Sequence, residues 1–363
     1  MQVADQRYQV DEFSVPKIGP DEGLLKIEAC GMCGSDVEQY DGAFAALGVT
    51  YPVIAGHEPI GTIEEIGAAA AQRWNVRVGD RVAIEPVLSC GHCRPCLTGR
   101  YRRCATGRPG AGQVNCYGYL PTSVRPSLWG GYAEYMYLDP QTVLHKLDPA
   151  LPIELAALYQ PMAAGVRWFA HESNLALGDT VVILGCGQRG LAGLVAAREA
   201  GAGRVIVTGL ESDAHKLDIA RRLGADATII ADREDTVERV REITDGRMAD
   251  VVVDVSAVSI QPVLDALDIA TGGGTIILGG VKGSAAVASL RPDKIVVKEL
   301  NIRGVFSQDI RAFEPALRLI ESRKYPLEQL HTHTFGLDQV DLAVQTLAGR
   351  VDNEKAVHVM ITP

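Results

Sequence analysis

Residues 181–201 read VVILGCGQRGLAGLVAAREAG, and this stretch decides the fold. An apolar run typical of a buried strand leads into a G-x-G-x-x-G turn formed by Gly185, Gly187 and Gly190, and a helical pattern follows. These glycines allow a tight turn, so that backbone N–H groups at the start of the helix can approach a pyrophosphate. A second strand-like run, RVIVTG at 204–209, follows at the expected distance. This context favours dinucleotide binding over an empty Gly-rich turn.

Strand-like and helical patterns alternate around this turn, from residue 155 to residue 299. The runs at 250–256 (DVVVDVS) and 274–280 (GTIILGG) are further examples of predicted strands. Such alternation is typical of a parallel sheet with helices on both faces, so we predict a doubly wound α/β domain. In residues 1–154 the apolar runs are short and separated by Gly and Pro, which indicates a β-rich domain. Residues 300–363 contain two amphipathic helical patterns and a last strand, and we expect them to return to the first domain.

Length and composition support a two-domain protein that binds a small molecule. A chain of 363 residues can bury two cores, and its 47% hydrophobic and 22% charged residues are typical of globular proteins. The net charge of -10, without any Lys/Arg-rich run, argues against nucleic acid or an anionic membrane as a partner. The N-terminus lacks a signal-peptide pattern, and no apolar run approaches the ~20 residues that span a bilayer. We therefore expect a cytoplasmic protein, whose eight cysteines are better interpreted as metal ligands than as disulfides.

Four of these cysteines lie in one lobe, at residues 88–106. Four thiolates on one tight loop can close a tetrahedron around zinc, which leaves no position for water or substrate and makes the site structural. Free thiols and a redox dithiol are weaker alternatives. An iron–sulfur cluster is also disfavoured, since such runs have a shorter gap before the fourth Cys and usually a Pro after it. The cysteines follow C-x2-C-x2-C-x7-C at Cys90, Cys93, Cys96 and Cys104.

A second group of metal-ligating residue types comes from two separate segments. Cys33 and His57 are each followed closely by an acid, Asp36 and Glu58 respectively. A few protein ligands with acids beside them are typical of an open zinc site, which keeps a position for water or substrate. Asp36 is suited to orient His57, and the hydroxyl of Ser35 could accept the proton of an alcohol. Taken alone, these residues are equally consistent with a buried thiol and a satisfied polar histidine.

In chain order, these motifs resemble the zinc-containing medium-chain dehydrogenase/reductase family, specifically its alcohol and sorbitol-type polyol dehydrogenases. The ordered set is CGSD, GHE, the four-Cys lobe, GGYAEY, the Gly-rich turn and the C-terminal return, which covers nearly the whole chain. The resemblance implies a GroES-like catalytic domain split around a Rossmann domain, with the active site in the cleft between them. It also implies hydride transfer between an alcohol, such as a secondary alcohol or polyol, and NAD(H). Cys33 and His57 match the catalytic zinc ligands, Ser35 the proton-relay hydroxyl and Asp36 the acid behind the ligands.

The chain departs from the family pattern at the third zinc ligand and in the proton relay. Many relatives have Cys, Asp or Glu just before a Pro at the start of the cofactor domain, where this chain has Gln160. A neutral amide is a poor zinc ligand, so Gln160 could instead hold the zinc-bound water. In the sorbitol dehydrogenase branch the Glu of GHE can bind the metal, which makes Glu58 the preferred third ligand. Glu38 occupies the position where many relatives have a His at the outer end of the relay.

The cofactor itself is expected to be NAD rather than NADP. Gly209 replaces the acid that usually ends the second Rossmann strand and accepts the ribose hydroxyls. Glu211 lies two residues further and is the candidate replacement, and no Arg stands beside it to meet a 2′-phosphate. Gln188 and Arg189 lie inside the Gly-rich turn. Arg189 could reach the pyrophosphate, although an exposed Arg without a partner is an equal alternative.

Other properties are left open by the residues. A dismutase or lyase with a permanently bound dinucleotide is an alternative on the same fold, and a non-catalytic zinc-binding protein is a weaker one. Relatives are homodimers or homotetramers, so we expect a homo-oligomer. A group of aromatic residues could line an alcohol pocket or simply be packing residues. They are Phe44, Tyr51, Trp129 and Phe306.

Overall fold

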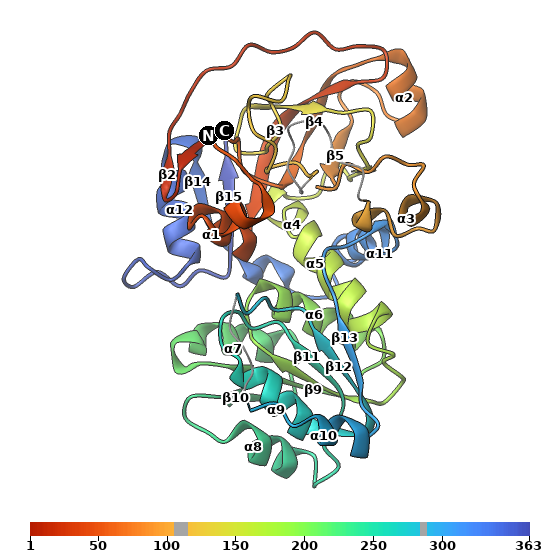
Figure 1. Cartoon of the computed structure of the whole chain (residues 1–363), viewed down its shortest axis with the longest axis vertical. Coiled ribbons are helices and arrows are strands. Elements are labelled where there is room, and N and C mark those ends of the chain that lie inside the picture. The colour runs from red at the N-terminus through yellow and green to blue at the C-terminus, as the bar shows by residue number, and fades with distance from the viewer. Residues whose placement is uncertain (105–114, 284–288) are drawn as a thin grey trace. The chain divides into compact units, whose positions relative to one another are not determined.

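The computed structural model describes residues 1–104, 115–283 and 289–363. The chain forms two compact units, of which the first combines Met1–Gln160 with His331–Pro363 (Figure 1). None of the helices in the described ranges has the length and apolar character of a membrane-spanning segment.

The second unit, Pro161–Leu330, differs from the sequence prediction at its C-terminal boundary. The return to the first domain was expected at residue 300, but residues 300–330 stay with the second unit. The reason is that Asn301–Gly304 forms a strand, β13, that extends the parallel sheet beside β12 (Ala270–Leu278). The helix α11 (Ile310–Glu321), which was expected to belong to the returning segment, also buries its apolar face within the second unit.

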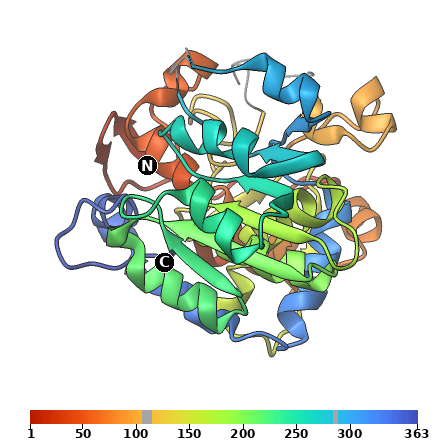
Figure 2. The ribbon, with the colours of Figure 1, turned by 90° about the horizontal axis from the view of Figure 1, so that it is seen from below.

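The sheet of the second unit is parallel throughout, with the strand order β10-β9-β8-β11-β12-β13. This is the order of a Rossmann sheet, which confirms the predicted doubly wound fold. Helices lie on both faces, as the view from below shows (Figure 2). The remaining strands are β8 (Thr180–Leu184), β9 (Arg204–Gly209), β10 (Ala227–Ile230) and β11 (Ala249–Asp254). The other helices are η3 (Val166–His171), α6 (Gln188–Glu199), η4 (Glu211–Asp213), α7 (Ala214–Arg222), α8 (Thr236–Ile243), α9 (Gln261–Ile269), α10 (Pro292–Val297) and η5 (Leu327–Leu330).

The central strands of this sheet are the ones that the sequence revealed most clearly. Val182, Ile206 and Val252 are fully buried in one core cluster, because a parallel strand covered on both faces needs a continuous apolar run. Every residue of β13, by contrast, is exposed. Its sequence, NIRG, therefore lacks the apolar pattern by which the other strands were predicted.

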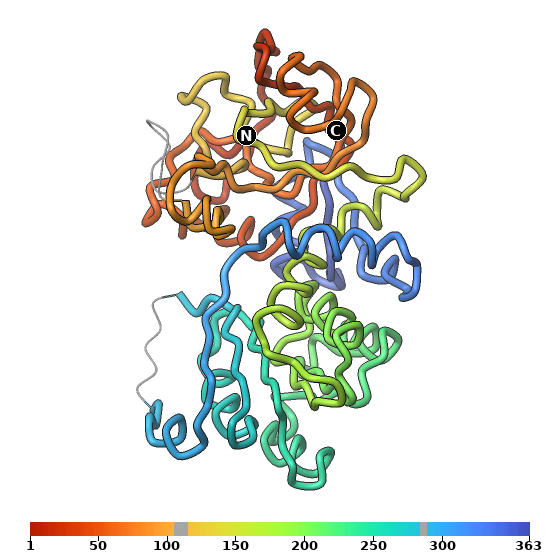
Figure 3. Tube along the Cα trace, turned by 90° about the vertical axis from the view of Figure 1, so that its right-hand side faces the viewer, coloured from red at the N-terminus to blue at the C-terminus, as the bar shows by residue number. Residues whose placement is uncertain are grey.

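The first unit contains the β-rich, GroES-like fold that the sequence predicted. Its main sheet has the order β14-β15-β3-β4-β5-β7, with β6 paired to β3, and the C-terminal strand β15 lies antiparallel to β3. In Figure 3 the C-terminal segment, drawn in blue, runs among the N-terminal segments, drawn in red and orange. The strands are β1 (Gln2–Ala4), β2 (Arg7–Tyr8), β3 (Gly23–Met32), β4 (Glu58–Ile66), β5 (Arg81–Ile84), β6 (Tyr135–Leu138), β7 (Leu144–Lys146), β14 (His331–Gly336) and β15 (His358–Thr362). The helices are α1 (Gly34–Tyr40), η1 (Ala43–Leu47), α2 (Ala68–Trp74), α3 (Arg94–Leu97), η2 (Tyr101–Arg103), α4 (Ile153–Ala156), α5 (Tyr159–Gly165, across the unit boundary), η6 (Leu337–Gln339) and α12 (Val340–Leu347).

The core of this unit decides between the two interpretations of Trp129. Its indole is fully buried between Tyr117 and Tyr137, at ring-centroid distances of 6.2 and 5.1 Å. The indole Nε1 donates a hydrogen bond to the carbonyl of Val124. Trp129 is therefore a packing residue and does not line an alcohol pocket.

Candidate metal and cofactor sites

The register of two strands brings Cys33, His57 and Glu58 together. β3 and β4 pair antiparallel with Gly31 opposite Glu58, so the end of β3 lies beside the start of β4. Cys33 follows β3 directly and occupies the N-cap of α1, while His57 immediately precedes β4 and Glu58 is its first residue. The His57 Nε2 atom lies 3.4 Å from Cys33 Sγ and 3.7 Å from Glu58 Oε1. One ligand atom from each of the three residues lies within 4.8 Å of the others.

This donor set fits a zinc ion. All three side chains are buried, and thiolate, imidazole and carboxylate are the ligand types that zinc takes. Burial alone would lower the pKa of His57, but the negative charges of Asp36 and Cys33 raise it well above its usual value. The surroundings thus stabilise a positive charge at this point. Three protein donors fill three of four tetrahedral positions, which suits catalysis.

Two polar groups stand behind the histidine. Asp36 Oδ1 lies 3.5 Å from His57 Nδ1, and Asp36 Oδ2 accepts a 2.8 Å hydrogen bond from the backbone N–H of Cys33. The hydroxyl of Tyr119 lies 3.2 Å from the same His57 nitrogen. Sequence reasoning missed Tyr119, because nothing in its local pattern distinguishes it from a core aromatic residue. Phe44 packs on Tyr119 at a centroid distance of 5.3 Å, so this aromatic candidate lies beside the centre.

The other predicted residues lie around these donors in different ways. Gln160 is buried, and its Nε2 lies 3.5 Å from the carbonyl oxygen of His57, so its amide faces the backbone of a candidate ligand. Ser35 is the second residue of α1 and half-buried, and Glu38 lies one turn later on the same helix.

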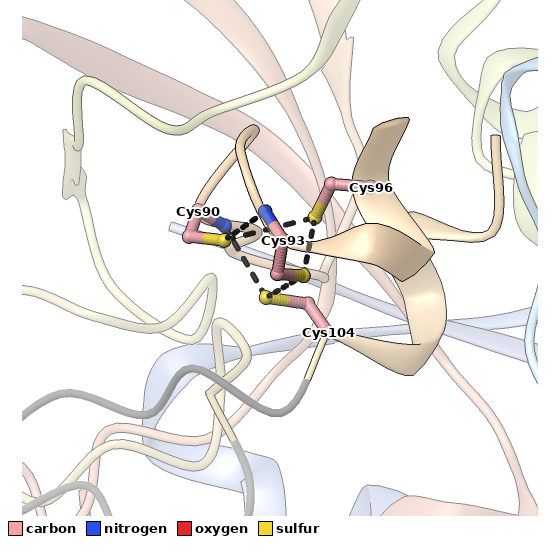
Figure 4. Close-up of side chains that lie close together, drawn as sticks. All are labelled: Cys90, Cys93, Cys96 and Cys104. Atoms are coloured by element: carbon pink, nitrogen blue, oxygen red, sulfur yellow. Dashed lines mark hydrogen bonds between the residues drawn. The ribbon is translucent and has the colours of Figure 1, made fainter. Parts of the chain in front are cut away.

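The four predicted thiols converge on one point (Figure 4). Thiolates at about 2.3 Å from a tetrahedral zinc ion would be about 3.8 Å apart. The measured sulfur–sulfur distances are 3.4 Å for Cys93–Cys96, 3.8 Å for Cys93–Cys104 and 3.9 Å for Cys90–Cys96. Burial and the neighbouring Cys93 thiol raise the pKa of Cys96 to about 12, so a nearby cation is needed to hold the Cys96 side chain as a thiolate. Residues 105 and 106, the end of the predicted lobe, lie outside the described residues.

A hydrogen bond to a buried glutamate joins this lobe to the residues beside the sheet. The Tyr101 hydroxyl donates to Glu85 Oε2 at 2.5 Å, and His145 Nε2 lies 2.8 Å from Glu85 Oε1. Glu85 and His145 are both buried, whereas the lobe is half-exposed. The fold of the lobe is thereby linked to the stability of β5 and β7.

The Gly-rich turn has the geometry that a dinucleotide requires. Gly185 has φ +114°, and Gly187 is the N-cap of α6. A Cβ atom at Gly190 would lie 2.0 Å from the carbonyl oxygen of Gly185, so only glycine allows this close packing of helix and strand. Gln188 is buried, and the Arg189 guanidinium lies 5.3 Å from the centroid of the Trp168 ring. Arg189 is therefore stacked on an aromatic partner, which excludes the alternative of an exposed side chain without one.

The end of β9 differs from the sequence interpretation in one respect. A Cβ atom at Gly209 would lie 2.5 Å from Cys186 Sγ, so the thiol fills the position of the usual acid. Glu211 was expected to lack a neighbouring Arg, but the guanidinium of Arg233, which follows β10, pairs with its carboxylate. Parallel pairing of β9 and β10 brings these residues together although they are distant in sequence.

Family models match both units. The alcohol dehydrogenase GroES-like domain matches residues 19–149, and the zinc-binding dehydrogenase model matches residues 190–322. A probable alcohol dehydrogenase of Mycobacterium tuberculosis is 40% identical over 99% of this chain and 96% of its own length. The protein belongs to the zinc-containing medium-chain dehydrogenase family. The predicted resemblance is confirmed, and the dehydrogenase is an oxidoreductase that depends on zinc and a nicotinamide cofactor and acts on an alcohol or polyol.

Further relatives of this dehydrogenase include polyol enzymes and solved structures. The sorbitol dehydrogenase of Bacillus subtilis is 31% identical over 98% of this chain and 94% of its own length. An alcohol dehydrogenase structure from Thermotoga maritima has a TM-score of 0.86 and 26% identity, covering 99% of this chain and 97% of that one. A putative zinc-binding dehydrogenase from Sinorhizobium meliloti, bound to NADP, has a TM-score of 0.85 and 27% identity, covering 99% and 97%.

Proposed function

We propose that this enzyme oxidises a secondary alcohol or polyol to a ketone, transferring hydride to NAD and releasing one proton. The catalytic zinc is held by Cys33, His57 and Glu58, and a second, structural zinc is held by the four-Cys lobe. The observation that carries the proposal is the convergence of three unlike, buried donors at the junction of β3 and β4. The similarity to the sorbitol dehydrogenase of Bacillus subtilis supports a polyol as substrate.

Each residue has a distinct part in this chemistry. When bound, zinc supplies a Lewis acid that makes the alcohol proton easier to remove. Ser35 accepts that proton from its half-buried position on α1 and passes it outward. Gln160, whose amide faces the His57 backbone, helps to fix the ligand segment. The Gly-rich turn, with Gln188 and Arg189, binds the pyrophosphate of the cofactor.

Metal content tests this assignment directly. Wild-type enzyme should contain two zinc ions per chain, and Cys33→Ser should contain one, with NADH formation from a panel of polyols and secondary alcohols in wild type only. Cys96→Ser should also lose one zinc ion, which serves as the control for the other site. Equal zinc content in wild type and Cys33→Ser would refute the proposed ligand set.

The preference for NAD is proposed to depend on Glu211. Its carboxylate can accept the ribose hydroxyls, and it neutralises Arg233, the residue that would otherwise attract a 2′-phosphate. Asp232 Oδ1 accepts a 2.8 Å hydrogen bond from the Glu211 N–H and adds a second negative charge nearby. Glu211→Gln frees the guanidinium and should shift the NADP/NAD affinity ratio about tenfold toward NADP, about 1.4 kcal/mol.

Fluorescence titration with NADH and NADPH measures this shift. Arg233→Ala is the matched control, since it removes the cation and should keep NADPH binding weak. Stronger binding of NADPH than NADH by the wild-type enzyme would contradict the assignment of NAD.

The oligomer is proposed to be a homodimer, or a homotetramer built from such dimers. β13 ends the sheet order of the second unit among the described residues, and all four of its residues are exposed. Val296 and Val297, just before it on α10, are 74% and 81% exposed. An edge strand flanked by apolar side chains favours antiparallel pairing with a second copy. Ile302→Lys should therefore yield monomers in light scattering, and an unchanged mass would refute this interface.

A further inference from the structure

A lysine with little exposed surface lies at the carboxyl edge of the parallel sheet in the second unit. Lys282 follows β12, and its side chain is 13% exposed. Its Nζ atom lies 2.9 Å from Oδ2 of Asp254, the last residue of β11. It also donates hydrogen bonds to the Ser256 carbonyl at 2.6 Å and to the Ser256 hydroxyl at 2.8 Å. An ammonium group has three donors, so Lys282 ties the segment after β12 to the segment after β11 with all of them.

Asp254 and Ser256 form the other side of this contact. Asp254 is fully buried, and its Oδ1 atom accepts hydrogen bonds from the backbone N–H and the hydroxyl of Ser256, at 3.0 and 2.6 Å. A buried carboxylate that loses its cation is strongly destabilising. Lys282 supplies the cation, and the ion pair thereby fixes both the backbone and the side chain of Ser256.

Ser256 lies between the turns that follow the strands on either side of β11. A Cβ atom at Gly185, after β8, would lie 3.0 Å from the Ser256 backbone nitrogen. A Cβ atom at Gly280, after β12, would lie 1.9 Å from the Ser256 carbonyl oxygen. β8 and β11 are the neighbouring strands at which the strand order reverses, and dinucleotides bind outside the carboxyl ends of the strands at this point. The ion pair therefore lies where the cofactor is expected.

The segment after Ser256 has a strained backbone. Val258 has φ +65°, which is unfavourable for a β-branched residue, and its N–H donates a 3.2 Å hydrogen bond to the Val281 carbonyl. Both valines are exposed, at 79% and 52%. Such strain persists only where the surrounding structure maintains it, and it is concentrated at ligand-binding and active sites. Lys282, which follows Val281 in the chain, is the residue that joins the two segments through its side chain.

The position of this valine pair relative to β8 indicates which half of the cofactor it faces. Glu211, proposed to bind the adenosine ribose, follows β9 on one side of β8. β11 and β12 lie on the other side of β8. A dinucleotide bound across the Gly-rich turn therefore has its nicotinamide half on the side of Val258 and Val281.

We propose that Lys282 is a positioning residue for the nicotinamide half of the cofactor, because its contacts with Asp254 and Ser256 hold Val258 and Val281 in the conformation that receives this half. The inference rests on the proposed function, in which the Gly-rich turn binds a dinucleotide. Lys282 itself does not contact the cofactor. A segment that is ordered before the cofactor arrives loses less conformational entropy on binding, and this raises affinity.

Lys282→Met tests this role, because it removes the charge and keeps an unbranched apolar stem. Calorimetric titration with NADH and with ADP compares the whole cofactor with its adenosine half. The affinity for NADH should fall about tenfold, as expected when a binding segment loses its prior order, whereas the affinity for ADP should keep its wild-type value. A purely structural role would lower stability and leave the ratio of the two affinities unchanged.

Two further variants keep the test informative if Lys282→Met does not fold. Lys282→Met combined with Asp254→Asn removes both charges, so that no buried carboxylate is left without its cation. This double variant should show the same selective loss of NADH affinity. Val258→Gly removes an exposed side chain at a φ angle that glycine adopts freely, so it should keep thermal stability and still weaken NADH binding.

Lys298→Met is the matched control in the same unit. The Nζ atom of Lys298 donates hydrogen bonds to the carbonyls of Leu267, Asp268 and Ala270, at 2.8, 3.0 and 2.8 Å. Ala270 is the first residue of β12, so this lysine lies at the opposite edge of the sheet. The control variant should lose stability and keep wild-type affinity for both NADH and ADP.

Two results separate the possible failures. An unchanged ratio of NADH to ADP affinity in Lys282→Met, whether both affinities persist or both fall equally, would overturn the role of Lys282. Failure of the wild-type enzyme to bind either NADH or NADPH would instead refute the proposed function, whatever the variants show.

Discussion

The two sulfur-containing sites of this dehydrogenase are built in opposite ways. In the lobe, four identical donors lie between Cys90 and Cys104 of the chain, are half-exposed and converge on one point. At the other centre, Cys33, His57 and Glu58 come from the end of one strand and the start of another, and all three are buried. In the proposed assignment, four thiolates would close the first site, whereas three unlike donors would leave a position for substrate at the second.

This difference shows where a metal site obtains its precision. The loop sets the sulfur positions through short-range backbone geometry, so sequence spacing alone specifies the lobe. The buried centre depends on strand register and on groups such as Asp36 and Tyr119 that orient its donors. Changes in the two regions should therefore have different consequences. A change at the buried centre should lower turnover, and a change in the lobe should lower stability.

Cys33→Ser should have the largest effect. Removing the thiolate should cost about 4 kcal/mol of transition-state stabilisation, which lowers kcat/KM about a thousandfold. Thermal stability should change little, because the lobe keeps its own metal. Steady-state kinetics with the best alcohol measure the first effect and calorimetry the second. Turnover close to wild type would remove the functional contrast between the two sites.

Cys96→Ser should affect stability more than chemistry. Loss of one of four thiolates releases the structural zinc, and the free energy of unfolding should fall by about 3 kcal/mol. Urea denaturation measures this loss, and kcat of the protein that remains folded should stay near the wild-type value. If stability is unchanged, the lobe is not a structural zinc site.

Glu58 and Gln160 can be ranked as third ligand by paired variants. Glu58→Gln removes an anionic donor 3.7 Å from His57 Nε2. It should lower zinc affinity at this centre by about tenfold or more, as changes around metal sites typically do. Gln160→Leu keeps the volume of the side chain and should lower the zinc affinity by less than about tenfold. Chelator competition compares the two. A larger loss in Gln160→Leu would identify the amide as the ligand.

Arg350→Ala should have the smallest effect. Arg350 makes two hydrogen bonds to Asp41, at 2.9 and 2.6 Å, and so ties the end of α1 to the C-terminal segment. These bonds lower the pKa of the Asp41 carboxyl, so their stabilising effect is present at neutral pH and is lost as the pH falls through that lowered pKa. Because both side chains are partly exposed, the loss at pH 7 should be below about 1 kcal/mol.

Chemical denaturation at several pH values checks this prediction. The difference between wild type and Arg350→Ala should shrink below about pH 4, the ordinary range of a carboxyl group. Zinc in the lobe should be retained at pH 7 in both proteins. A difference that grows on acidification would contradict the assigned sign.

The sequence by itself determined the features that short spacings encode. The turn at Gly185, Gly187 and Gly190 predicted the Rossmann sheet, and the lobe cysteines predicted a closed site. In both cases residues that are close in the chain are also close in space. The spacing of the glycines or cysteines therefore specifies the geometry of the turn or of the metal site. The apolar runs of β8, β9, β11 and β12 were recognisable for the same reason, since each strand contains a buried run of at least four residues.

Only the tertiary structure decided the features that depend on contacts between distant segments. It assigned residues 300–330 to the second unit, through an exposed strand whose pairing its composition does not reveal. It brought Arg233 to Glu211 and Tyr119 to His57. A side chain's chemical type is visible in the sequence, but its partner is set by strand register and by the packing of turns, which no local pattern contains.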